Sequence, residues 1–244
     1  MGRVSDGPRP QAPLGVVMLD HELVRPPGDV GNPDTFPFPT LHRVIKGVTL
    51  ERLLNRDPAI LADLITAGRE LEEAGAWGIA SGCGFFVIFQ AEVASALGIP
   101  VFLSSLIQIP FVQQTIGPES AVGVLTAHSG RLTRDHIVAA GALPETTVIV
   151  GLEDKPAFSQ GVLISGGEYD RAAMEREIIL GAKELAAQKI HGRAIGALVF
   201  ECTNLPPFAR AVQAALGLPI YDSTTLIKSV RRAVFRKDFQ GDKG

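Results

Sequence analysis

Short apolar runs alternate along the chain with longer segments whose apolar residues recur every three or four positions. The short runs have the length and composition of buried strands, and the longer segments have the period of amphipathic helices. The pattern predicts strands at residues 15–19, 44–48, 77–81, 101–104, 122–126, 147–151, 197–201 and 220–222. It predicts helices at residues 50–74 (with a break near Pro58), 86–97, 106–115, 133–142, 167–189, 206–216 and 223–236.

This alternation, with short connections, is typical of a parallel sheet covered by helices on both faces. A repeat divides the pattern into halves. Ala-Leu-Gly-Ile-Pro-Val-Phe at 96–102 resembles Ala-Leu-Gly-Leu-Pro-Ile-Tyr at 215–221, and the glycine of each copy follows a cysteine, Cys83 or Cys202, by 15 residues. Equal spacing at two landmarks indicates a duplicated unit. We therefore predict an α/β protein with two pseudo-symmetric parallel-sheet domains and an active site in the cleft between them.

The predicted boundaries assign residues 13–105 and 222–244 to the first domain and residues 106–221 to the second, after a flexible tail at 1–12. The connection at 20–41 is long for a compact domain, and it holds five prolines and two phenylalanines. Connections of this length are usually functional or disordered, and the phenylalanines argue against disorder. The sequence leaves open whether the connection is a lid or cleft wall, a stiff surface loop or a contact between subunits.

Charge and composition narrow the range of partners. The formal net charge is −3 and the isoelectric point is near 6.0, which gives no reason to expect nucleic acid or an anionic membrane. No apolar run approaches the roughly 18 residues of a membrane span. Two cysteines and no secretory signal fit a reduced chain. We expect a cytoplasmic protein that binds a small-molecule carboxylate, and we leave a homo-oligomer open.

Cys83 and Cys202 each stand where a predicted strand ends and a helix begins. The number of cysteines alone favours a structural role, as a disulfide or as two buried thiols. Their position suggests more, because ligands of open parallel sheets bind at the carboxyl ends of the strands. The following helix N-terminus favours anions, so it is expected to hold a substrate carboxylate and to lower the thiol pKa. Two such thiols predict proton removal on one face of a carbon and proton return on the other.

Other polar residues also end predicted strands. Asp20 ends the first strand and Thr126 ends the fifth, so both are candidates for substrate binding, with turn or cap roles as the alternatives. Glu201 directly precedes Cys202. Because neighbours on a strand point to opposite faces, Glu201 is expected to point away from that thiol and is not predicted to be the base.

Motifs for a metal or a nucleotide are missing from the sequence. The five histidines show no ligand spacing, with His128 and His136 eight residues apart. Gly82-Cys83-Gly84 follows a strand but lacks the third glycine of a dinucleotide fingerprint. We therefore expect chemistry without a cofactor or a metal.

These residues together resemble the aspartate/glutamate/hydantoin racemase superfamily, in a less characterised branch of it. The resemblance extends from Gly15 to about Val230. Its carriers are Gly-Val-Val-Met-Leu-Asp at 15–20, Ser-Gly-Cys-Gly-Phe at 81–85, Val-Gly-Val-Leu-Thr at 122–126, Glu-Cys-Thr-Asn at 201–204 and Leu-Pro-Ile-Tyr-Asp at 218–222. The resemblance implies two pseudo-symmetric domains around one site, with Cys83 and Cys202 as the acid and base thiols.

The resemblance also implies a substrate-binding set around the two thiols, namely Asp20, Gly84, Thr126, Thr203 and Asn204. Two members depart from the pattern of the amino-acid racemases. Gly84 replaces the asparagine that typically follows the first cysteine, and Asn204 replaces the histidine or glutamate that often follows the second Cys-Thr pair. These changes affect the expected anchor for an amino-acid backbone, whereas the pair of thiols is intact.

The combined prediction is an isomerase, a cofactor-independent racemase or epimerase acting beside a carboxylate or carbonyl of an amino-acid or hydantoin-like substrate. Three alternatives remain open at this stage. Two belong to the same superfamily: a maleate-type cis–trans isomerase and an arylmalonate-type decarboxylase. The third is a non-enzymatic protein that binds a small molecule in the same cleft.

Overall fold

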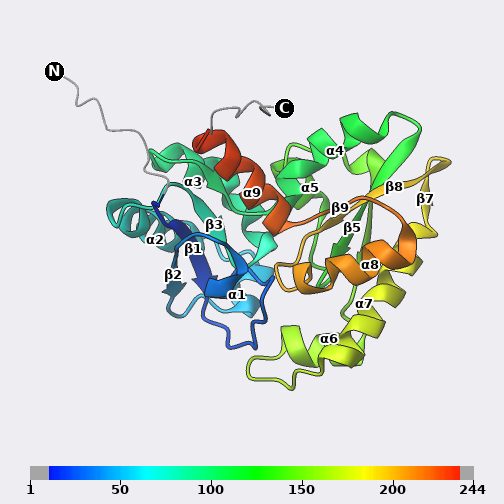
Figure 1. The fold of residues 1–244 in the computed structure, drawn as a ribbon, viewed down its shortest axis with the longest axis horizontal. Coiled ribbons are helices and arrows are strands. Elements are labelled where there is room, and N and C mark those ends of the chain that lie inside the picture. The colour runs from blue at the N-terminus through cyan, green and yellow to red at the C-terminus, as the bar shows by residue number, and fades with distance from the viewer. Residues whose placement is uncertain (1–10, 237–244) are drawn as a thin grey trace, which may run out of the picture.

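The polypeptide folds into two α/β halves that lie side by side, as Figure 1 shows. A computed structural model describes residues 11–236. Four parallel strands form the first sheet in the order β2-β1-β3-β4. In the second sheet β6, β5, β8 and β9 run parallel, and β7 pairs antiparallel with β8. The strands are β1 (Leu14–Leu19), β2 (Thr40–Ile45), β3 (Ile79–Ser81), β4 (Val101–Phe102), β5 (Ser120–Thr126), β6 (Thr147–Gly151), β7 (Lys189–Ile190), β8 (Arg193–Phe200) and β9 (Ile220–Tyr221).

The two halves repeat one topology. In each half the second strand lies at an edge, followed by the first, the third and the fourth parallel strands: β2-β1-β3-β4 corresponds to β6-β5-β8-β9. The predicted fold class, two pseudo-symmetric halves with parallel sheets, is therefore confirmed. The short antiparallel strand β7 is an addition that the sequence pattern did not predict.

Helices cover the faces of both sheets. α2 packs on β1 and β2, and α7 packs on β5 and β6. α9 follows the second half but returns to the first sheet, where Leu226 and Ile227 pack with Leu14 and Val16 of β1. Figure 1 shows α9 in red. The α-helices are α1 (Leu50–Leu54), α2 (Ile60–Glu73), α3 (Gln90–Ala96), α4 (Ile109–Ile116), α5 (Arg134–Ala139), α6 (Pro156–Phe158), α7 (Arg171–Ala186), α8 (Ala209–Leu216) and α9 (Ser223–Val234).

One buried cluster joins the halves. Val17 of β1 and Phe86 belong to the same cluster as Val124 of β5 and Val199 of β8, and all four are 0% exposed. Burial of each such side chain contributes about 1.5–3 kcal/mol to stability. In addition, the Ser105 hydroxyl, in the first half, donates a hydrogen bond to the carbonyl oxygen of Phe200 at the end of β8. The ends of the two sheets are thus fixed relative to each other.

Several element boundaries differ from the prediction. β2 occupies 40–45 rather than 44–48, because its register with β1 starts at Thr40 and the chain turns at Gly47, whose φ is +75°. α7 begins at Arg171 rather than at 167, because Asp170 caps it by accepting a hydrogen bond from the Ala173 N–H. The segment before it forms α6 and a π-helical turn, Ser159–Leu163, neither of which was predicted.

The predicted break near Pro58 is confirmed, since α1 ends at Leu54 and α2 begins at Ile60. Most of the predicted tail at 1–12, and the last residues of the predicted first domain, lie outside the described residues. Within residues 11–236, no helix is both long and apolar enough to cross a membrane.

Candidate functional site

A pocket with an empty volume of about 410 Å³ lies between the halves, at the carboxyl ends of both sheets. Residues at or directly after the ends of β1, β3, β5 and β8 line it. This volume counts all the space between the lining atoms, including solvent at the mouth, so the enclosed part of the pocket is smaller and suits only a small ligand. Its wall is formed by Leu19, His21, Leu23, Arg25, Leu50, Gly82, Cys83, Gly84, Phe85, Ala127, Val162, Leu163, Glu201, Cys202, Thr203 and Asn204.

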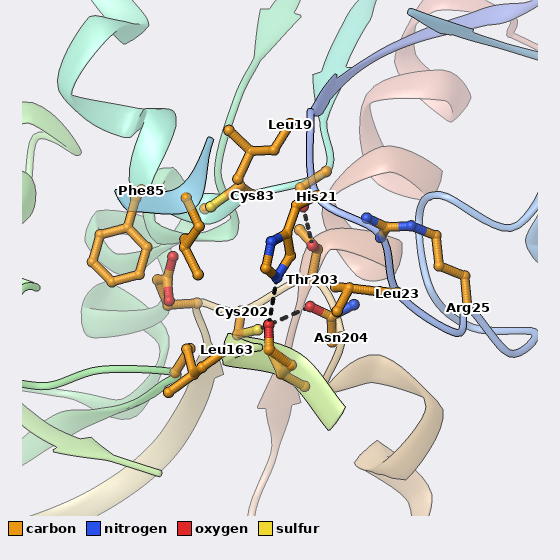
Figure 2. Close-up of a pocket in the computed structure, with 16 residues that line it drawn as sticks. Leu19, His21, Leu23, Arg25, Cys83, Phe85, Leu163, Cys202, Thr203 and Asn204 are labelled. Carbon is orange, nitrogen blue, oxygen red and sulfur yellow. Dashed lines mark hydrogen bonds between the residues drawn. The ribbon is translucent and has the colours of Figure 1, made fainter. Parts of the chain in front are cut away.

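Each half contributes one thiol to this pocket, as Figure 2 shows. Cys83 follows β3 and precedes a short 3-10 helix, Gly84–Phe89. Cys202 follows β8, and its Sγ donates a hydrogen bond to Oδ1 of Asn204 at 3.5 Å. Both cysteines are free thiols, so a structural disulfide does not explain them. The sequence prediction that both thiols reach one cleft is correct in its geometry.

The expected effect on the thiol pKa is wrong. Burial raises the pKa of Cys83 and of Cys202, and the carboxylate of Glu201 raises both further. Arg25 acts in the opposite direction on Cys83. The helix that follows Cys83 begins as a 3-10 turn, and its favourable influence is smaller than the cost of desolvating a thiolate. Burial and the Glu201 carboxylate therefore both favour the protonated thiols at neutral pH.

Glu201 lies in the pocket wall, contrary to the sequence interpretation. β8 ends at Phe200, so the alternation of side chains along the strand no longer applies to Glu201 and Cys202. The residue is 1% exposed, and burial raises the pKa of its carboxyl to about 7, although hydrogen bonds from Thr126 and the Ala127 N–H lower it. This carboxyl is thus poised between its neutral and charged forms near physiological pH.

Arg25 brings a positive charge to the same pocket. Its guanidinium Nη1 lies 3.0 Å from Oδ1 of Asp29, a carboxylate that is fully buried. The amide nitrogen of Asn204 donates to the other oxygen of Asp29. Because the Gly31 N–H also donates to Asp29, at 2.7 Å, this carboxylate is well satisfied and holds both Arg25 and Asn204 in place. Arg25 comes from the connection at 20–41, which forms a wall of the pocket.

Two of the predicted substrate-binding residues complete the junction of the halves. Gly84 lines the pocket beside Cys83, and any larger residue there would collide with Glu201. Thr203 also lines it, and its hydroxyl donates to the carbonyl oxygen of Gly82 at 2.7 Å. Gly84, Thr203 and Asn204 thus lie with the thiols, whereas their roles toward a substrate remain predictions.

The other two predicted residues lie outside the pocket wall. Asp20 lines a neighbouring groove, where its carboxylate accepts the Gly47 N–H at 2.9 Å and pairs with Lys46. The hydrogen bond from Gly47 lowers the pKa of Asp20. Thr126 is fully buried beneath the pocket, and its hydroxyl donates to Oε2 of Glu201 at 2.7 Å. Thr126 therefore supports a residue of the wall, and its role toward a substrate remains a prediction.

Sequence reasoning did not select three polar residues of this wall: His21, Arg25 and Glu201. The signal for the first two was the connection at 20–41, whose length and aromatic residues indicated a cleft wall. Figure 2 shows His21 between the thiols and Arg25, with its Nε2 hydrogen-bonded to the Val162 carbonyl oxygen at 2.9 Å. This bond ties the connection to the second half.

No family model matches the chain. Its sequence is 35% identical over 225 residues to dimethylsulfoniopropionate lyase 3 of Emiliania huxleyi (strain CCMP1516). The matched region covers 89% of this chain and 58% of that protein. It is also 35% identical over 220 residues to the dimethylsulfoniopropionate lyase of Durusdinium sp. clade D, covering 87% of this chain and 71% of that protein. The chain belongs to the dimethylsulfoniopropionate lyase family. It spans about three-fifths of the length of the first of these lyases.

Solved structures show that this chain shares its fold with aspartate racemase and arylmalonate decarboxylase. Picrophilus torridus aspartate racemase superposes with a TM-score of 0.57 at 14% identity, covering 91% of this chain and 93% of the racemase. Arylmalonate decarboxylase superposes with a TM-score of 0.55 at 14% identity, covering 92% of this chain and 94% of the decarboxylase. The fold that the resemblance implied is confirmed, and identities this low carry the fold alone.

Membership in a lyase family corrects the functional prediction. The racemase or epimerase and its stated alternatives are contradicted, because the relatives that match most of this chain are named as lyases of dimethylsulfoniopropionate. The sequence motifs that suggested a racemase belong to the fold and to the pair of thiols. A base that removes a proton beside a carboxylate serves racemases and eliminating lyases alike, so the thiols alone did not separate the two.

Proposed function

We propose that this chain is a carbon–sulfur lyase that cleaves dimethylsulfoniopropionate, or a close sulfonium carboxylate, by β-elimination. One observation carries the proposal: in a chain of this lyase family, two free thiols and an arginine face one small pocket between the halves. The proposal keeps the predicted small-molecule carboxylate as ligand. It also implies a reducing compartment such as the cytoplasm, since oxidised cysteines cannot serve as bases.

The proposed reaction needs one base. A thiolate removes a proton from the carbon next to the carboxylate, and the electron pair of that C–H bond forms a C=C bond to the next carbon. The carbon–sulfur bond breaks, and its electron pair leaves with the sulfur. The products are dimethyl sulfide and acrylate, and the proton remains on the thiol. Because a sulfonium leaves as a neutral sulfide, no acid is required for the leaving group.

The raised thiol pKa fits a cationic substrate. While the pocket is empty, desolvation and Glu201 keep Cys83 and Cys202 protonated. A sulfonium brings a positive charge into the same pocket, which favours the thiolate and offsets part of its desolvation. The base therefore forms when the substrate is present, and an empty pocket does not hold a reactive thiolate.

Arg25 is the proposed anchor of the substrate carboxylate. Its guanidinium has five N–H donors, and only nitrogen Nη1 pairs with Asp29. The residue lines the same pocket as the thiols. A guanidinium near the carboxylate stabilises the negative charge that develops there when the adjacent proton is removed. Since one thiol is the base, the other supplies an S–H donor toward the same carboxylate.

The test is release of dimethyl sulfide from dimethylsulfoniopropionate, measured by headspace gas chromatography, with serine and alanine variants of each cysteine. At the base position both substitutions lower kcat/KM by about 100-fold or more, because a hydroxyl is a far weaker base than a thiolate. At the donor position serine retains more activity than alanine, since its hydroxyl still donates. Full activity in all four variants would refute the thiol mechanism, and no release by the unsubstituted protein would refute the lyase.

A further inference from the structure

The pocket contains a buried carboxylate that lacks a balancing cation. Glu201 is 1% exposed and forms no salt bridge within residues 11–236. Its Oε2 accepts the Thr126 hydroxyl and the Ala127 N–H also stabilises the carboxylate, but its Oε1 has no hydrogen-bond partner in the described chain. An unpaired buried carboxylate oxygen is costly, so its retention in the pocket wall points to a group that arrives with the ligand.

Gly84 provides the space for this oxygen. A Cβ on Gly84 would lie 2.4 Å from Oε1 of Glu201 and 2.3 Å from its carbonyl oxygen, closer than atoms can approach. The carboxylate therefore packs against the backbone beside Cys83 and Phe85. It also influences both thiols, since it raises the pKa of Cys83 and of Cys202. The negative charge is thus adjacent to the place where the proton transfer is proposed.

Positive charge enters the pocket from the other side. Figure 2 shows Arg25 and Phe85 on opposite sides of the two thiols. Glu201 packs at the Phe85 side through its contact with Gly84, and Arg25 is held at its own side by Asp29. Much of the remaining wall is apolar, with Leu19, Leu23, Leu50, Ala127, Val162 and Leu163. The pocket therefore complements a short molecule that has a negative end, a positive end and apolar groups.

We propose that Glu201 binds the cationic end of the substrate and restricts the enzyme to small zwitterions that carry a fully alkylated onium group. This inference rests on the proposed function and names its substrate class. A primary ammonium needs acceptors for three N–H groups, whereas Oε1 of Glu201 and apolar side chains offer one acceptor. A sulfonium or quaternary ammonium has no N–H or O–H donor to satisfy, so diffuse negative charge and apolar contact suffice.

The test compares the binding of two inert ligands of equal shape by isothermal titration calorimetry. Both are acetates; one carries a trimethylammonio group on its α-carbon and the other a tert-butyl group, so neither has a leaving group that β-elimination could release. The unsubstituted protein is expected to bind the onium ligand about 100-fold more tightly than the neutral one, a ratio typical of a close charge pair. Glu201→Gln removes this preference. The control Glu22→Gln removes an exposed charge from the connection at 20–41 and leaves the preference for the onium ligand unchanged.

A second variant covers the case in which Glu201→Gln does not fold. Thr126→Val removes the hydrogen bond to Oε2, so it raises the pKa of Glu201 and moves onium binding to higher pH. The other titratable groups that share the pocket wall with Glu201 are Cys83, Cys202, Arg25 and His21, and they are unchanged in this variant. The binding of the neutral ligand is expected to shift much less with pH.

Two outcomes overturn the inference: equal affinity for the two ligands in the unsubstituted protein, or a preference that persists in Glu201→Gln. Because neither ligand reacts, these results are independent of dimethyl sulfide release. Release of dimethyl sulfide without an onium preference would leave the lyase intact and refute the role of Glu201. An onium preference without release would refute the lyase and retain Glu201 as the cation site.

Discussion

At the scale of single residues, one charged group in the pocket lowers the stability of the folded protein. Glu201 is buried without a counter-ion, and its carboxyl pKa is raised to about 7. In an unfolded chain this carboxyl would have a pKa near its ordinary value of 4.5. Between these values the folded protein binds a proton that the unfolded chain has lost. Stability from this residue is therefore fully present below about pH 4.5 and is lost as pH rises through about 7.

This linkage gives a prediction for Glu201→Gln. At pH 8 the variant is expected to have a higher free energy of unfolding than the unsubstituted protein, by about 1–3 kcal/mol, because a neutral amide replaces a buried charge. Near pH 4.5 the difference should vanish. Urea denaturation at both pH values measures it. A variant that is less stable at pH 8 than its parent would contradict the assigned burial of the charge.

The chain order of the residues was enough to predict the two thiols but not the surroundings that set their chemistry. Cys83 and Cys202 were identified because strand ends and a repeat can be counted along a sequence. Glu201 was misplaced because its orientation depends on where β8 stops pairing, which β5 and β9 determine. Asp20 directly follows β1 as predicted, but its carboxylate accepts the Gly47 N–H from the turn after β2 and lies outside the pocket wall.

At the scale of elements, α9 links the two halves, since it follows the second half and returns to cover the first sheet. Its start is marked by a capping motif. Asp222 is its N-cap, and its Oδ1 accepts hydrogen bonds from the Thr225 N–H and the Thr224 hydroxyl, each at 2.8 Å. The Thr225 hydroxyl in turn accepts the Asp222 N–H at 2.9 Å, which completes a capping box. Burial raises the pKa of Asp222.

A matched pair of caps tests this element. Asp222→Ala is expected to cost about 2 kcal/mol, at the upper end of measured cap losses, because it removes both side-chain bonds of a buried cap. Asp170→Ala removes the exposed cap of α7, a single bond to the Ala173 N–H at 2.9 Å, and is expected to cost about 0.5–1 kcal/mol. Chemical denaturation of the two variants gives both values. Equal losses would show that burial of Asp222 contributes nothing.

Elements with their own caps and periodicity were predictable, and those fixed by neighbours were not. The helix after Pro58 and the strand before Cys202 follow from local sequence. β7 has two residues, and it exists because β8 extends far enough to pair with it. The π-helical turn Ser159–Leu163 likewise has no sequence signal, although its Val162 and Leu163 line the pocket. Part of the wall thus depends on tertiary contacts that periodicity does not encode.

At the scale of the whole molecule, the pocket is as rigid as the junction between the halves. The Ser105 hydroxyl donates across this junction to the Phe200 carbonyl oxygen at 2.5 Å, and Ser105 is 1% exposed. The Gly166 N–H also donates to the Glu22 carbonyl oxygen, at 2.9 Å, so the connection at 20–41 is bound to both halves. Such contacts fix the two halves, each with its thiol, relative to each other.

Two serines of equal chemistry test this junction. Ser105→Ala is expected to destabilise the protein by about 1–3 kcal/mol, because it leaves a buried carbonyl oxygen without its hydroxyl donor. Ser95→Ala removes an exposed hydroxyl that bonds within α3, at 2.8 Å to the Ala91 carbonyl oxygen, and is expected to change stability by less than about 0.5 kcal/mol. Thermal unfolding compares them, and a similar small effect for both would contradict a role for Ser105 in joining the halves.

The duplicated topology has a further consequence for how a molecule can sit in the pocket. Gly82 precedes the cysteine of the first half, and Glu201 precedes the cysteine of the second, although both follow corresponding strands. Two matching halves with matching residues would accept a ligand in either of two reversed orientations. A glycine on one side and a glutamate on the other remove that equivalence. Under the proposed function, the same carbon of a dipolar substrate then faces the same thiol in every complex, so two halves of similar topology give the bound substrate a single orientation.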